Sequence, residues 1–97
     1  MSTTVILEIR TNPGTANEML TMLKDILPDT RNYDGCVSVD VFQNQDDADT
    51  LIIMGKWQSK VHFETYLDWR NETGIFERFS EMIEGPPNTH FFNDTDA

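Results

Sequence analysis

A tyrosine and an arginine four residues apart offer the most definite chemistry in this sequence. The spacing of Tyr66 and Arg70 puts both side chains on one face of a helix. A phenol in an apolar pocket can hold a substrate hydroxyl or carbonyl and take part in proton transfer. A guanidinium on an otherwise apolar face can stabilise an enolate or bind a carboxylate. We therefore name Tyr66 and Arg70 as candidate catalytic residues.

Both residues also have structural explanations. Tyr66 can be a core tyrosine whose hydroxyl reaches the edge of the core. Arg70 can pair with Glu64 or Glu72 and support a subunit interface, where arginine is common. The sequence alone leaves these alternatives open.

The two histidines are the candidates for a base that works near neutral pH. His62 precedes Tyr66 by four residues and can lie near it on one helix, whereas His90 belongs to a different element. We therefore name His62 as the candidate catalytic base. Asp40, inside a predicted strand, is either a further base with a raised pKa or a solvated edge charge.

Aromatic residues near Tyr66 are candidates for binding a flat ligand. Trp57 stands where a predicted strand meets a helix, so it can stack on a ligand or pack that corner. Trp69 can approach Tyr66 at a helical offset. The candidate substrate-binding residues are Trp69, Trp57, Phe63 and Phe76.

The sequence predicts no metal site and no cofactor. Asp46, Asp47 and Asp49 form a polar loop that lacks the glycine and the distal glutamate of a calcium loop. Cys36 is the single cysteine, which excludes an internal disulfide and a zinc-type pair, and we expect it to be an inert core thiol.

Periodic apolar segments predict four strands and three helices. The strands are expected at Thr3–Arg10, Cys36–Gln43, Thr50–Trp57 and residues 89–92. In the second strand we expect Val37, Val39 and Val41 on one face, opposite Cys36, Ser38, Asp40 and Phe42. Three residues are expected to cap the helices: Thr15, which has capping-box spacing to Glu18, then Ser59 and Thr73. Pro28 is expected to end or kink the first helix.

This order of elements predicts a ferredoxin-like α+β fold. A split β-α-β repeat gives a four-stranded antiparallel sheet with helices on one face. Residues 3–92 form the single domain, and residues 93–97 form an acidic tail that we expect to be flexible. The third strand is apolar on both faces, so a second subunit is expected to cover the side that the helices leave free.

The charge of the chain limits its partners. The 97 residues include 17 acidic and 7 basic side chains, for a net charge of −10. Such an excess repels phosphate backbones and anionic lipids, so neither nucleic acid nor a membrane surface is an expected partner. The N-terminal residues lack a signal-peptide pattern, and no apolar stretch approaches the ~18 residues of a membrane span. We expect a cytoplasmic protein.

Three segments resemble the antibiotic biosynthesis monooxygenase family. They are residues 33–36 (Tyr-Asp-Gly-Cys), residues 55–59 (Gly-Lys-Trp-Gln-Ser) and residues 66–74 (Tyr-Leu-Asp-Trp-Arg-Asn-Glu-Thr-Gly). The similarity extends over about residues 3–92. It implies a homodimer, a dimeric α+β barrel whose two sheets face each other, with a pocket between helices and sheet in each subunit. Some members oxidise aromatic polyketides with oxygen and without metal or flavin.

The haem-degrading branch of the family is a poor match. Its asparagine, tryptophan and histidine correspond to Leu7, Tyr66 and Ser80 in this sequence, so no proximal ligand to iron is present. Two hypotheses follow. One is a cofactor-independent monooxygenase that acts on a small aromatic or quinone-like substrate. The other is a non-catalytic dimeric module that binds a small molecule, and the lack of an obvious acid–base pair supports it.

Overall fold

The first strand, β1 (Thr3–Arg10), shows how the sheet acquires one covered and one open face. Val5 and Ile9 are buried under the helices, whereas Glu8 is exposed on the other side. The computed structural model describes residues 2–97. The other elements, in chain order, are α1 (Ala16–Arg31), β2 (Cys36–Gln43), β3 (Thr50–Trp57), α2 (Lys60–Glu72), α3 (Ile75–Glu81) and β4 (Asn88–Asn93).

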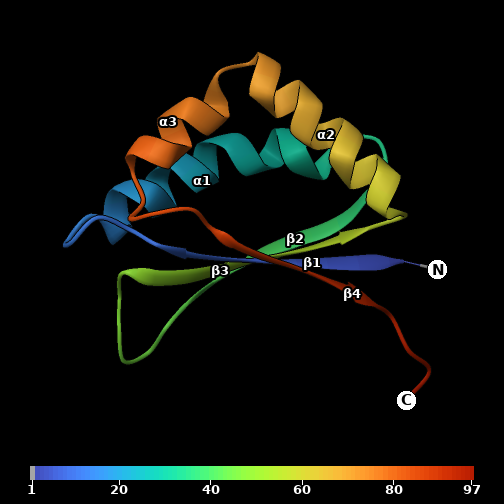
Figure 1. Cartoon of the computed structure of the whole chain (residues 1–97), viewed down its shortest axis with the longest axis horizontal. Helices are drawn as coiled ribbons and strands as arrows, with labels where there is room; N and C mark the ends of the chain where they lie inside the picture. The colour runs from blue at the N-terminus through green and yellow to red at the C-terminus, as the bar shows by residue number, and fades with distance from the viewer. Residues whose placement is uncertain (1) are drawn as a thin grey trace.

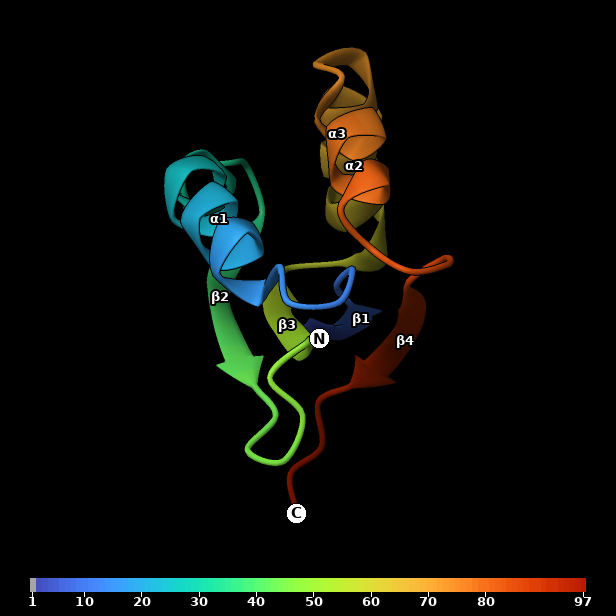
Figure 2. The same ribbon diagram turned by 90° about the vertical axis from the view of Figure 1, so that its left-hand side faces the viewer.

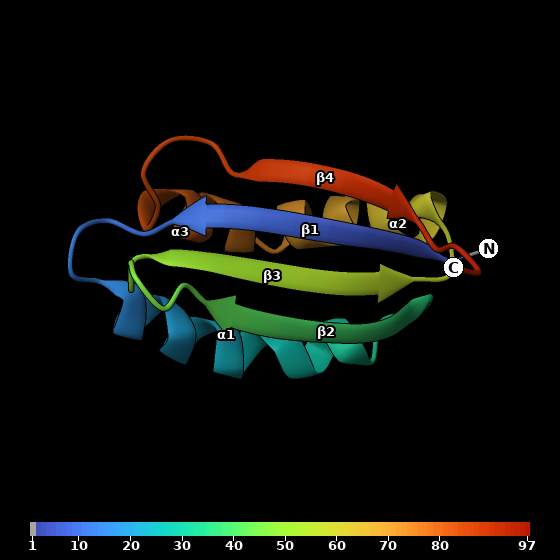
Figure 3. The same cartoon turned by 90° about the horizontal axis from the view of Figure 1, so that it is seen from below.

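The four strands form one antiparallel sheet in the order β2-β3-β1-β4. All three helices lie on one side of it (Figure 1). The view from below shows the opposite face with no helix across it (Figure 3). This is the ferredoxin-like α+β arrangement that the sequence predicts. No helix of residues 2–97 is long and apolar enough to cross a membrane.

The helices form two separate covers over the sheet (Figure 2). α1 lies over the β2 edge, and α2 with α3 lies over the side of β1 and β4. The larger buried cluster joins α1 to the sheet and contains Ile9, Met19, Leu23, Leu27, Val39, Leu51 and Ile83. A smaller cluster contains Val5, Trp57 and Tyr66 and joins α2 to the sheet.

A bulge in β2 corrects the predicted faces of that strand. Cys36 pairs with Trp57, and Ser38 pairs with Lys56, so Val37 is an extra residue without a partner. The side chain of Val37 is 59% exposed, whereas Cys36 packs against both buried clusters. The prediction that Val37 shares a face with Val39 was therefore wrong, because the bulge reverses the alternation at that point.

Two of the three predicted helix caps were also wrong. The Thr15 hydroxyl donates to the carbonyl of Asn12, 2.7 Å away, and accepts nothing from α1. Thr73 ends α2 and donates to the Arg70 carbonyl, while Gly74 in the left-handed conformation begins α3. Ser59 does cap α2, because its hydroxyl accepts from the backbone N–H of His62.

Pro28 lies inside α1, which continues beyond it to Arg31. Proline removes only its own donor, and the backbone N–H of Asn32 still bonds to the Pro28 carbonyl. The helix therefore extends far enough to bring Thr30 into the core, where it is buried.

The aspartate-rich loop before β3 bonds to its neighbours. Arg10 forms a salt bridge with Asp47, and Thr50 donates to the same carboxylate. Asp49 accepts from the Thr11 hydroxyl and from the backbone of Gly14, both at 3.1 Å. Among residues 2–97, no three His, Cys, Asp or Glu side chains converge on a possible metal position.

The Arg10–Asp47 pair predicts a small pH dependence of stability. The hydrogen bond from Arg10 holds the pKa of the Asp47 carboxyl below its ordinary value. Such a carboxylate stabilises the fold above its unfolded pKa, and this is lost as the pH falls through the folded pKa. Asp47→Asn is therefore expected to lower the melting temperature at pH 7, with the gap to wild type closing below about pH 4. Asp46→Asn is the matched control, and a gap that persists in strong acid would contradict the expectation.

Candidate functional site

An apolar cavity lies between the helices and the sheet. Its volume is about 400 Å³, within the usual range for small-molecule sites. Aliphatic side chains from β1, β3 and α1 form much of its wall, and the aromatic rings on the wall are those of Trp57, Phe63, Tyr66, Phe76, Phe79 and Phe91. A cavity with this lining is suited to a flat aromatic ligand.

Four hydroxyl groups and the indole N–H of Trp57 are the polar side-chain groups of this wall. The hydroxyls belong to Thr30, Tyr66, Ser80 and Thr89. Among residues 2–97, no carboxylate, imidazole or ammonium group lines the cavity. Any ligand oxygen therefore has to be recognised by hydroxyl groups, the indole N–H or backbone groups.

Two of these hydroxyls bond to a buried guanidinium. Arg70 Nε donates to Tyr66 Oη at 2.9 Å, and Arg70 Nη2 donates to Thr30 Oγ1 at 2.9 Å. Nη2 also donates to the carbonyl of Ile26 at 2.7 Å. Tyr66 Oη and Thr30 Oγ1 lie 2.7 Å apart. We call these three side chains the Thr30–Tyr66–Arg70 cluster.

The guanidinium of this cluster is buried among neutral groups. Arg70 is 3% exposed, and no carboxylate of residues 2–97 lies within salt-bridge distance of it. It therefore pairs with neither Glu64 nor Glu72. Its planar group lies 4.6 Å from the ring centre of Trp69, in a cation–π contact. Arg70 does not line the cavity, so its charge reaches a ligand through Tyr66 and Thr30.

The model of the antibiotic biosynthesis monooxygenase family matches residues 2–81. The chain belongs to this family. Solved structures share its fold at low identity. A conserved protein of Methanosarcina mazei is 16% identical, with a TM-score of 0.87 over 98% of this chain and 94% of its own. A solved antibiotic biosynthesis monooxygenase is 14% identical, with a TM-score of 0.84 over 96% and 98% of the two chains.

A protein of Pseudomonas aeruginosa is 23% identical, with a TM-score of 0.78 over 97% of this chain and 94% of its own. Identities this low show a shared fold and leave the substrate open. Among curated proteins, no sequence matches the chain.

In this family member, four of the predicted site residues line one cavity. Trp57, Phe63, Tyr66 and Phe76 all belong to its wall, and Arg70 lies directly behind Tyr66. The helical spacing therefore brings Tyr66 and Arg70 together as expected.

Two predicted site residues lie outside the cavity wall. His62 Nδ1 is 2.7 Å from the Ser59 hydroxyl, at the cap of α2. Trp69 stacks on Tyr33 with ring centres 5.2 Å apart and is not among the residues that line the cavity. His90 pairs with Ile6, which places it on the open face of the sheet. The described residues thus give the cavity no histidine.

The packing of His62 against Gly35 makes a sharp prediction about stability. Gly35 has a φ of +87°, and a Cβ added there would lie 2.5 Å from the His62 Cβ. Gly35→Ala is expected to lower the free energy of unfolding by about 3 kcal/mol, because left-handed strain adds to an overlap. Gly74→Ala is the control, since Gly74 has a φ of +78° with no atom near its Cβ position, and should cost only about 1–2 kcal/mol. Urea unfolding measures both variants, and an equal loss of unfolding free energy in Gly35→Ala and Gly74→Ala would contradict this expectation.

Sequence reasoning missed Thr30. The signal was present, because Thr30 continues the apolar stripe of Met19, Leu23 and Leu27 at helical spacing. The expectation that Pro28 ends or kinks the first helix concealed it. A polar residue in line with an apolar stripe is a sign of a buried hydrogen-bonding group.

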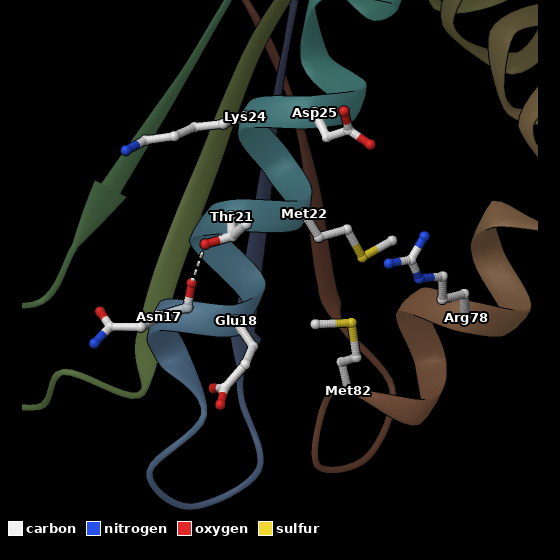
Figure 4. A pocket seen from close by; sticks show the side chains of 8 residues that line it. All are labelled: Asn17, Glu18, Thr21, Met22, Lys24, Asp25, Arg78 and Met82. Carbon is white, nitrogen blue, oxygen red and sulfur yellow. Dashed lines mark hydrogen bonds between the residues drawn. The ribbon is translucent and has the colours of Figure 1, made fainter.

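A second hollow lies on the surface between α1 and α3 (Figure 4). Met22 and Arg78 point toward each other across it (Figure 4). Its lining mixes both charge signs and consists of Asn17, Glu18, Thr21, Met22, Lys24, Asp25, Arg78 and Met82. Most of these side chains are exposed, so this groove lacks the enclosed wall of the main cavity.

Proposed function

We propose that the chain is a cofactor-independent monooxygenase that oxidises a small aromatic or quinone-like substrate with oxygen. The observation that carries the proposal is an aromatic-walled cavity in which a phenol, backed by a buried guanidinium, is a main polar contact. Membership of the family supports the reaction class.

The proposed reaction begins with the anion of an acidic C–H or phenol of the substrate. This anion transfers one electron to O₂, and the resulting radical and superoxide combine to a peroxide. Loss of water converts a substrate methylene into a carbonyl. The chain orients the substrate among its aromatic rings, excludes water and donates a hydrogen bond from Tyr66 to the developing oxyanion. Arg70 is a positioning residue that holds the phenol through its Nε–H.

Oxygen uptake tests this function directly. Metal-stripped, flavin-free protein is mixed with anthrones, hydroquinones and catechols, and the rate is compared with the spontaneous one. We expect faster uptake with at least one substrate and one ¹⁸O atom from labelled O₂ in its product. Spontaneous rates across the panel would contradict the proposal.

A second candidate function is a non-catalytic dimeric module that binds a small molecule. The observation in its favour is that no carboxylate or imidazole of the described residues lines the cavity. This function predicts tight binding of an aromatic ligand, seen as a thermal shift, without oxygen uptake. The two assays together therefore separate the candidates.

As part of this proposal, the active form is a homodimer in which the open faces of two sheets meet. Ile6 pairs with Met54 on that face, and Phe42 and Phe92 are about half exposed there. A patch of apolar side chains on an open sheet face is typical of a subunit interface. We also place the protein in the cytoplasm, because its one free cysteine needs no oxidising compartment.

Met54→Lys is expected to convert the dimer to a monomer. Burial of an ammonium at the centre of the sheet face opposes association, and pairing with Asp40 on the neighbouring strand offsets only part of that cost. Light scattering should give twice the 11.2 kDa chain mass for the wild type and the single mass for the variant. Val61→Lys on the exposed side of α2 is the control. A monomeric wild type would contradict the proposal.

A further inference from the structure

The open face of the sheet carries an acid at one edge and a histidine at the other. Asp40 lies on β2 and pairs with Met54, and His90 lies on β4 and pairs with Ile6. Ile6 also pairs with Met54, so the four residues form one row across the sheet. Figure 3 shows the strands in this order, with β2 and β4 at the two edges.

The packing of neighbouring residues places both side chains on the open face. Val39, which precedes Asp40, is 4% exposed in the cluster under the helices. Phe91, which follows His90, packs on an aromatic ring of α2. Successive side chains of a strand point to opposite faces, so Asp40 and His90 point away from the helices. The rings of His90 and Phe92 lie 6.2 Å apart, as expected for two residues on one face.

Neither group has an ionic partner within its own chain. Among residues 2–97, Asp40 and His90 form no salt bridge, and both residues are exposed. The other charged groups on this face are Glu8, Arg10, Lys56 and, through its bond to Thr4, Asp94. These groups belong to the same chain, so they act on Asp40 and His90 both before and after a second chain arrives.

A symmetric pair of such faces has two possible orientations. The two-fold axis lies between the sheets and runs either along the strands or across them. An axis along the strands sets β2 of one chain against β4 of the other, and Asp40 then meets the partner's His90 at two places. An axis across the strands sets β2 on β2 and β4 on β4, and each charge then meets its own copy.

Charge favours the axis along the strands. Each chain has a net charge of −10, so two chains repel each other as they approach. Two facing Asp40 carboxylates add to this repulsion, whereas a carboxylate that faces an imidazolium reduces it. The two-fold symmetry doubles either effect, because each contact occurs twice.

We propose that a second copy of this chain covers the open face with its axis along the strands, and that Asp40 of each subunit pairs with the protonated His90 of the other. The inference rests on the homodimer of the proposed function and adds its orientation and its response to pH. Association takes up protons at His90, so the dimer tightens as the pH falls from 8 to 6. It weakens again below about pH 4, where Asp40 loses its charge.

The response to pH is the first test. Sedimentation velocity over a series of concentrations gives the dimer dissociation constant at pH 6 and pH 8. We expect the wild-type constant to be roughly tenfold lower at pH 6. His90→Gln keeps a polar side chain without the titrating proton and retains His62, so its constant should change by less than about twofold. A wild-type dimer of equal strength at both pH values would overturn the proposal.

An exchange of the two charges tests the orientation. Asp40→Lys sets lysine against histidine, and His90→Glu sets glutamate against aspartate, so each should weaken the dimer roughly tenfold or more at pH 6. The double variant restores opposite charges and should return to within about threefold of the wild type. With the axis across the strands, the double variant instead sets lysine on lysine and glutamate on glutamate. A double variant no stronger than the single ones would overturn the proposal.

Two substitutions on α2 are the controls. Glu64→Lys and Thr65→Glu make comparable charge changes at exposed positions on the helix side of the sheet, and the constant should stay within about threefold of the wild type. Circular dichroism confirms that every variant is folded. A wild type that is monomeric at both pH values would overturn the homodimer and this inference together. A dimer that responds neither to pH nor to the exchange overturns this inference alone.

Discussion

Tyr66→Phe is expected to lower the rate of oxygen uptake by about 10²-fold or more while the protein remains folded. The substitution keeps the ring that packs on Trp57 and removes the oxygen that meets the developing oxyanion. Loss of one such donor typically costs this much in rate. The free energy of unfolding should fall by only about 1–3 kcal/mol, because Arg70 Nε loses one acceptor.

The other tyrosine supplies the control for this experiment. Tyr33 packs edge-to-face on Tyr66, but its hydroxyl points to the backbone of Thr65 and does not line the cavity. Tyr33→Phe should therefore keep the wild-type rate within about twofold, as expected for a residue outside the site. Initial rates of oxygen uptake at saturating substrate measure both variants, and circular dichroism confirms their fold. An equal loss of oxygen-uptake rate in the two variants would show that the Tyr66 hydroxyl takes no part in the reaction.

Trp57→Ala is expected to have the largest effect on stability, about 3–5 kcal/mol in the free energy of unfolding. The indole is 1% exposed and contacts the rings of Phe63 and Tyr66, with centres 5.6 and 4.9 Å away. Its removal leaves a void at the strand-to-helix corner, and neighbouring side chains can fill it only in part.

Denaturant unfolding at equilibrium measures this change. Val61→Ala on α2 is the reference, because Val61 is 68% exposed and its truncation should shift stability by less than about 0.5 kcal/mol. A loss below about 1 kcal/mol in Trp57→Ala would show that this corner is not a major part of the core.

The strands were predictable because their signal is local. Apolar residues at every second position mark Thr3–Arg10, a nearly continuous apolar run marks Thr50–Trp57, and the observed bounds agree. The bulge at Val37 carried no such signal, since a run of alternating valines looks the same with or without an extra residue. Thr15 and Thr73 failed as caps because capping depends on the backbone before the helix.

The site was predictable where it depends on one helix. Spacing within α2 brings Tyr66 and Arg70 together without any knowledge of the sheet. The orientation of His62 depends instead on contact with Gly35 from another part of the chain. Thr30 joins Arg70 across 40 residues of sequence, a contact that only the packing of α1 against α2 determines.

The bonds from Arg70 to α1 also bear on how a ligand enters. Within residues 2–97, the side-chain hydrogen bonds that join α1 to α2 are those of the Thr30–Tyr66–Arg70 cluster and the Ile26 carbonyl. No side-chain hydrogen bond joins α1 to α3 among these residues, and the hydrogen bonds near them run from Asn12, before α1, to the carbonyls of Glu81 and Met82. The parts of the two helices away from Asn12 can therefore separate by breaking apolar contacts alone. Opening of the cavity therefore costs the least free energy beside α3. A ligand that enters there passes the phenylalanine rings first and meets the charged end last, so recognition of its oxygen follows entry.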